Sequence, residues 1–209
     1  MLKRKIYSCC IAILLACCML FTNAISANAY ETYGYTLNGG VGNFGYNTRY
    51  YYVDSSCTSS ITEKIAEAWS DWNYTTASLG ITTPISVKKT TTKSSSVFDF
   101  YYDTYWPEDD GLAGGTFYYN GQNLQNPSLS DPTGNWGWTQ IIINCPNYDY
   151  LSFISGNVDR HKSTIAHEIG HAFGLAHVDD EDKLMFNVMD TICVDSCTSD
   201  ELNGINALY

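Results

Sequence analysis

The sequence predicts an α+β fold built around a single β-sheet. Three observations lead to this prediction: an amphipathic pattern over residues 59–74, a series of short strand-like runs after it, and a second helical pattern that leads into a cluster of histidines. The chain has 209 residues, of which 44% are hydrophobic and 16% are charged. This composition is typical of a globular protein, and the length suits one domain with a full core.

The N-terminal segment predicts a secretory signal peptide over residues 1–29. It has a basic start, an apolar run over residues 6–21 and a small-residue cleavage site at Ala27–Ala29. Two alternatives are an uncleaved anchor helix and a lipoprotein signal at Cys17. We expect cleavage, a bacterial origin, and a secreted mature domain over residues 30–209 with no membrane attachment.

Removal of this segment makes the chain more acidic. The segment holds three basic and no acidic residues, so the formal net charge changes from −11 to −14. An acidic secreted protein is poorly suited to bind nucleic acid or anionic membranes. We therefore expect neither partner.

Four cysteines remain after the cleavage site: Cys57, Cys145, Cys193 and Cys197. An even number in an exported chain suggests two disulfides, for which three connectivities exist. The short spacing favours Cys193 with Cys197, which leaves Cys57 with Cys145. A zinc site made of cysteines is disfavoured because no close Cys-x-x-Cys pairs occur.

The elements follow from periodicity. In residues 59–74, apolar side chains recur at helical spacing from Ile61 to Trp72, and Ser60 with Glu63 predicts a capping box. Tyrosines gather in strand-like runs, where packing explains them. The strand-like runs cover residues 85–92, 95–103, 114–120 and 138–145, and the second and last helices are expected from about residue 160 and at residues 199–209.

Two polar features are interpreted as having no role in a site. The acidic cluster Glu108–Asp110 could hold calcium, but it lacks the spaced oxygen ligands of a calcium loop, so calcium is possible but unsupported. His161 is expected to be an exposed residue near a helix start.

The remaining three histidines predict a metal site. His167 and His171 are four residues apart, which places both imidazoles on one face of a helix, one turn apart. Glu168 follows the first histidine and projects beside the ion, where a general base for a water molecule is needed.

A glycine completes this arrangement. Gly174 can adopt a positive φ and end the helix, so that the chain turns and His177 returns to the same ion. Three nitrogen ligands leave a fourth position open, which is typical of a catalytic zinc rather than a structural one. We expect one Zn²⁺, for which cobalt or manganese could substitute.

The segment HEIGHAFGLAH resembles the extended zinc signature of the metzincin peptidases, and most closely that of the matrixin branch. The resemblance implies a twisted mixed sheet with an N-terminal helix, an active-site zinc helix and a C-terminal helix, the last similar to SDELNGINALY. It also implies a methionine turn at Met185 or Met189. The run GGTFYYN resembles the substrate-binding edge strand, with Gly114, Gly115 and Thr116 as its contact residues.

The sequence departs from the family pattern at several points. No Pro-x-Tyr wall follows Met185 or Met189, and no tyrosine lies two positions after either methionine. No cysteine-switch motif is present, so latency of that kind is not expected. A second, structural zinc is not expected either, because His161 is the only histidine left for it.

The resemblance implies a zinc endopeptidase that hydrolyses peptide bonds in extracellular proteins. Its partners would be protein or peptide substrates, and we expect a monomer. The alternative is a zinc-bearing surface-binding protein with weak or no catalysis. Loss of the glutamate or of a histidine would favour that alternative, but Glu168 and all three histidines are present.

Overall fold

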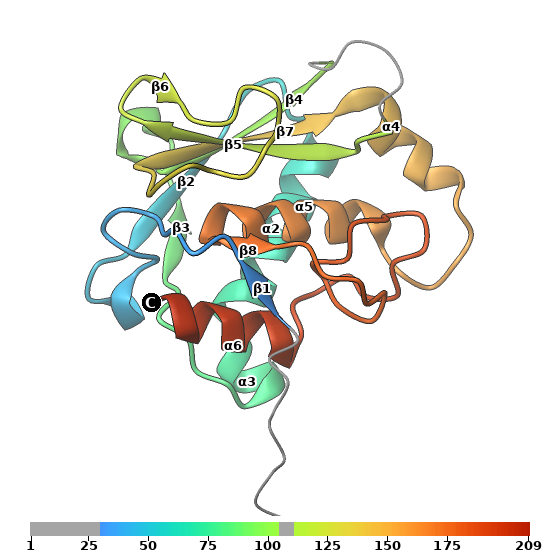
Figure 1. Ribbon diagram of the computed structural model, residues 1–209. Helices are drawn as coiled ribbons and strands as arrows, with labels where there is room; N and C mark the ends of the chain where they lie inside the picture. Colours follow the sequence, from blue (N-terminus) through green and yellow to red (C-terminus); the bar gives the residue numbers. More distant parts are fainter. Residues whose placement is uncertain (1–29, 105–110) are drawn as a thin grey trace, which may run out of the picture.

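The computed structural model describes residues 30–104 and 111–209 (Figure 1). The predicted signal peptide and the Glu108–Asp110 cluster lie outside the described residues. No helix in the described part of the chain combines the length and the apolarity that a membrane span needs.

A six-stranded mixed sheet forms one layer of the domain. Its strand order is β3-β2-β4-β7-β5-β6, and β5 runs antiparallel to both of its neighbours while the other pairs are parallel. The α+β fold with a mixed sheet is therefore confirmed. The strands are β2 (Arg49–Val53), β3 (Val87–Lys89), β4 (Phe98–Asp103), β5 (Gly114–Asn120), β6 (Asn123–Leu124) and β7 (Trp138–Asn144).

The helices form the other layer. Figure 1 shows α2 (Ser59–Asn73) and α5 (Arg160–Phe173) side by side below the sheet, with α6 (Ser199–Leu208) further from it. The shorter helices are η1 (Asn43–Gly45), α3 (Thr75–Leu79), η2 (Lys93–Ser95), α4 (Cys145–Tyr150) and η3 (Leu151–Phe153). A two-stranded antiparallel sheet joins β1 (Glu31–Thr32) to β8 (Leu175–Ala176).

Aromatic packing joins the two layers. Trp69 of α2 stacks on Tyr51 of β2 with ring centroids 5.1 Å apart, and it also meets Phe98 of β4. Phe173 of α5 meets Phe98 edge to face at 5.6 Å. The apolar stripe predicted for α2 is buried as expected, which confirms its periodicity. Burial of these large rings is the main favourable term that holds α2 and α5 against the sheet.

Several local expectations are wrong. The capping residue of α2 is Thr58, whose hydroxyl accepts from Ile61 N at 3.3 Å, so Ser60 and Glu63 do not form the box. The predicted N-terminal helix is α2, which follows strands β1 and β2. His161 is half-buried rather than exposed, because its Nε2 donates to the Tyr148 carbonyl at 2.9 Å.

The two predicted disulfides are not formed in the structure, in which all four cysteines are free. The Cys197 thiol donates to the Asp71 carbonyl of α2 at 3.4 Å, whereas exposed Cys193 contacts the Thr191 carbonyl at 3.6 Å. The two thiols therefore have different partners. Burial raises the pKa of Cys57 and Cys197 to about 12, which keeps these thiols protonated and unreactive at neutral pH.

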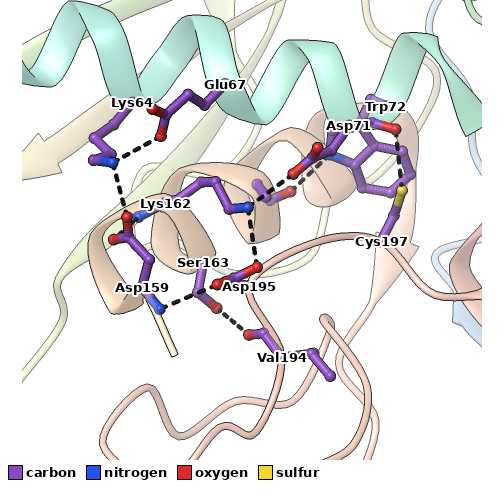
Figure 2. Close-up of polar contacts among 11 residues, drawn as sticks. Lys64, Glu67, Asp71, Trp72, Asp159, Lys162, Ser163, Val194, Asp195 and Cys197 are labelled. Atoms are coloured by element: carbon purple, nitrogen blue, oxygen red, sulfur yellow. Dashed lines mark hydrogen bonds and ion pairs between the residues drawn. The ribbon is translucent and has the colours of Figure 1, made fainter. Parts of the chain in front are cut away.

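A polar network fixes the start of α5 (Figure 2). Asp159 caps the helix by accepting from Lys162 N at 3.1 Å, and it pairs with Lys64 of α2 at 2.8 Å. The Lys162 ammonium pairs with Asp71 of α2 at 3.1 Å and with Asp195 at 3.0 Å. These contacts tie α5 both to α2 and to the segment that precedes α6.

We expect Asp159→Ala to lower the free energy of unfolding by about 1–2 kcal/mol at pH 7, because it removes a helix cap and an ion pair. Asp159→Asn is the matched control, since its side-chain oxygen still accepts from Lys162 N. Denaturant unfolding measures the free energy of unfolding of both variants. Equal stability of Asp159→Ala and the wild type would contradict this assignment.

The charge-dependent part of this effect has a defined pH window. Burial alone would raise the pKa of Asp159, but its bonds from Lys64 and Lys162 N hold it below the usual value. A lowered carboxyl pKa stabilises the fold above the unfolded pKa, and this stability is lost as the pH falls through the folded pKa. The difference in the free energy of unfolding between the wild type and Asp159→Asn should therefore shrink below about pH 4.

Candidate metal centre

Helix α5 brings the first two histidines together, and a left-handed turn adds the third. His167 and His171 are buried on the face of α5 that points toward the cleft, and His177 follows β8. His177 Nε2 lies 3.2 Å from His167 Nε2 and 3.1 Å from His171 Nε2. A tetrahedral zinc with bonds of 2.0–2.1 Å separates its nitrogen ligands by about 3.3 Å, so the three imidazoles fit this ion.

Gly174 makes the turn possible. Its φ is 105°, and a Cβ at this position would lie 2.7 Å from the Tyr35 carbonyl oxygen. Only glycine fits a left-handed backbone so close to another chain segment. The turn directs Leu175 and Ala176 into β8, and His177 then returns over the end of α5.

Backbone carbonyls determine which ring nitrogen faces the ion. Nδ1 of His167 donates to the Leu184 carbonyl at 2.7 Å, and Nδ1 of His171 donates to the Leu175 carbonyl at 2.8 Å. A carbonyl only accepts, so both Nδ1 atoms carry the proton and both Nε2 atoms offer a lone pair. Burial lowers the pKa of His167 to about 3, which keeps its ring neutral.

Glu168 lies beside the triad and is hydrogen-bonded from β5. The Thr116 hydroxyl donates to Glu168 Oε2 at 2.7 Å. Burial raises the pKa of Glu168 to about 7, and the bond from Thr116 opposes that rise. A nearby cation favours the ionised carboxylate, so bound zinc would lower this pKa again.

Tyr33 is a site residue that the sequence did not predict. Its hydroxyl oxygen lies 2.8 Å from His171 Nδ1, where it is a second acceptor for the Nδ1 proton. The two rings are nearly parallel, with an interplanar angle of 28° and centroids 5.8 Å apart. Tyr33 reaches the site because β1 pairs with β8, and no local motif could have indicated this pairing.

The two candidate methionines occupy different places. Met185 is buried beneath α5, where a Cβ at Gly170 would collide with its Sδ. Met189 is partly buried and lines the cleft. The segment before Met185 is anchored from α6, because Glu201 Oε1 accepts from Leu184 N at 2.8 Å and from Met185 N at 3.3 Å.

A cleft of about 480 Å³ passes over the triad. The predicted contact residues Gly114, Gly115 and Thr116 line this cleft, and so do residues 187–190. A Cβ at Gly114 would lie 3.0 Å from Glu168 Cγ, so the strand runs directly alongside the glutamate.

Comparison with protein families finds one match. Residues 46–209 match the family model of the matrixins. No curated protein matches the chain. The match covers the sheet, the three histidines, Glu168 and the C-terminal helix.

We expect Tyr33→Phe to weaken zinc binding about tenfold, because His171 loses one of the two acceptors that orient its ring. Phenylalanine keeps the ring contact, so the melting temperature should not change. Tyr35→Phe is the matched control at an exposed tyrosine of the same segment. Competition with a chromophoric chelator measures the affinity, and equal affinity of Tyr33→Phe and wild type would exclude this role.

Proposed function

The chain belongs to the matrixin family of zinc endopeptidases, and from this premise we propose that Glu168 is the general base of peptide-bond hydrolysis at the His167–His171–His177 triad. The observation that carries this proposal is the position of the Glu168 carboxylate. It is buried beside three converging Nε2 atoms and faces the same cleft. Bound zinc supplies a Lewis acid that polarises the scissile carbonyl and acidifies a water molecule.

Glu168 then handles the proton. Its carboxylate accepts a proton from the attacking water and passes it to the leaving amine, which needs a group with a pKa near the working pH. The Thr116 hydroxyl donates to Oε2 at 2.7 Å, so it orients this carboxylate. A side chain at Gly114 would crowd Glu168, since a Cβ there would lie 3.0 Å from Glu168 Cγ, so the glycine leaves room beside the glutamate.

We further propose that the substrate lies extended along β5. An extended peptide can add to an open strand edge by main-chain hydrogen bonds. The edge near Gly114, Gly115 and Thr116 lies in the cleft next to Glu168, which would place a scissile bond within reach of the base.

Met185 is proposed as the residue of the methionine turn. Its burial against Gly170, between the two histidines of α5, supports this role over that of Met189. Met189 lines the cleft instead, where it can contact the substrate.

Secretion is proposed from the N-terminal segment. Matrixins are usually secreted, and residues 1–29 have the pattern of a signal peptide. The substrates would then be extracellular proteins. A bacterial origin and a monomeric state stay predictions.

We expect Glu168→Ala to keep its zinc and to lower kcat at least a hundredfold, because the base is removed and the ligands are not. Bound metal is measured by atomic absorption, and proteolysis by cleavage of casein. The control is Glu181→Ala, which removes an exposed carboxylate outside the cleft. Wild-type cleavage by Glu168→Ala would exclude the proposed mechanism.

Chelation tests the metal requirement directly. In a casein zymogram of the wild type, we expect a chelator to abolish the cleared band, since the open coordination position is lost with the ion. Added Zn²⁺ should restore the band and added Ca²⁺ should not. Clearing that persists in the chelator would contradict a zinc-dependent peptidase.

A further inference from the structure

The backbone groups of β5 alternate between β7 and the cleft. Asn144 N donates to the Ala113 carbonyl at 2.9 Å, and residues 113 and 144 are opposite each other in the antiparallel register. Alternation then turns the N–H and C=O groups of Gly114, Thr116 and Tyr118 away from β7, toward the open edge.

One end of this open edge is already paired, by a side chain. Asn126 Nδ2 donates to the Thr116 carbonyl at 2.9 Å, and Asn126 Oδ1 accepts from Tyr118 N at 2.9 Å. These are the two bonds that a neighbouring strand would make to this pair of residues. The Asn126 side chain is almost fully buried, with 1% of its surface exposed. The next backbone bond, from Gln125 N to the Tyr118 carbonyl at 2.9 Å, begins the pairing with β6.

At the other end, just before β5 begins, the Leu112 carbonyl is also occupied, but by side chains of β7 and α4 rather than by a side chain on the open edge. The Leu112 carbonyl accepts from Asn144 Nδ2 at 2.7 Å and from Asn147 Nδ2 at 3.1 Å. Between these two ends, the N–H and C=O of Gly114 and the N–H of Thr116 face the cleft without a partner in residues 30–104 and 111–209. This short window lies next to Glu168, because a Gly114 Cβ would be 3.0 Å from Glu168 Cγ.

We propose that Asn126 is a specificity-determining residue that limits how much substrate backbone the edge of β5 can pair with. Its carboxamide takes the place of a substrate peptide unit, so the substrate pairs with Gly114 and with Thr116 N–H and not with Thr116 C=O or Tyr118 N–H. This inference rests on the proposed function, in which the substrate adds to β5.

The chemistry of the side chain supports this role. A carboxamide holds an N–H donor group and a carbonyl acceptor in one plane, as a peptide unit does, and it satisfies Thr116 C=O and Tyr118 N–H together. A carboxylate cannot donate to Thr116 C=O, and an alanine can do neither. Leu129, Ser130 and Asp131, which follow Asn126 in the chain, also line the cleft, so this loop can contact substrate residues that do not pair with β5.

The test uses the zinc-loaded Glu168→Ala protein, which binds peptides without cleaving them. The probes are peptides from a site that the wild type cleaves in reduced casein, lengthened residue by residue at either end. Calorimetry gives the Kd of each peptide. In the Glu168→Ala protein, the affinity should stop rising beyond a certain peptide length. In the double variant Glu168→Ala/Asn126→Ala, it should continue to rise with longer peptides. The longest peptides should bind the double variant about tenfold more tightly, through the two released backbone groups.

Asn126→Asp is the second variant, in case Asn126→Ala does not fold. It keeps the acceptor for Tyr118 N–H and frees only Thr116 C=O, so it should also extend the length profile. The role of Asn126 is overturned if the folded variants show the same dependence of affinity on peptide length as the Glu168→Ala protein. It is also overturned if the affinity of the Glu168→Ala protein rises with every residue added at both ends. A wild type that fails to cleave casein instead overturns the proposed function, and this inference with it.

Discussion

The rest of the metal centre depends on one hydrogen bond, from His167 Nδ1 to the Leu184 carbonyl. This bond leaves Nε2 free to ligate and fixes the plane of the ring. Leu184 is itself held from the other side, where Glu201 Oε1 accepts from its N–H at 2.8 Å. Glu201 Oε2 in turn accepts from Thr198 N at 2.7 Å, within the capping box of α6. The orientation of the His167 ring therefore depends on the position of α6, so the C-terminal helix is part of the structure that supports the metal centre.

A second constraint is the alignment of β5 with α5. A Cβ at Gly114 would lie 3.2 Å from Thr164 Cγ2 and 3.0 Å from Glu168 Cγ, whereas the Tyr118 hydroxyl donates to the His171 carbonyl at 3.1 Å. From Gly114 to Tyr118 the strand advances about 13 Å, and from Thr164 to His171 the helix advances about 10.5 Å. The two elements therefore lie alongside each other over a similar length. The same strand therefore orients Glu168 through Thr116 and borders the cleft.

The sequence predicted the parts of the site that are local. His167, His171 and Glu168 lie within one helix, and Gly174 provides the turn to His177, so spacing alone was sufficient. It could not choose between the two methionines, because that choice depends on which one packs against Gly170 after the chain folds back. Tyr33 was missed for the same reason, since its place follows from pairing between β1 and β8. The capping prediction for α2 failed because Thr58 offered an equivalent hydroxyl two residues earlier.

The cleft-lining segment 187–190 is held in place from the start of α5. The chain lacks the Pro-x-Tyr segment that follows the methionine turn in the family, and residues 187–190 line the cleft in that part of the chain. Arg160, the first residue of α5, fixes the end of this segment by donating from Nε and Nη2 to the Asp190 carbonyl at 3.2 and 3.1 Å. Val188 and Leu151 of η3 line the same cleft as His167 and provide apolar surface in it. Helix α5 thus supplies two histidines of the triad from its C-terminal half and anchors the cleft-lining segment 187–190 from its first turn.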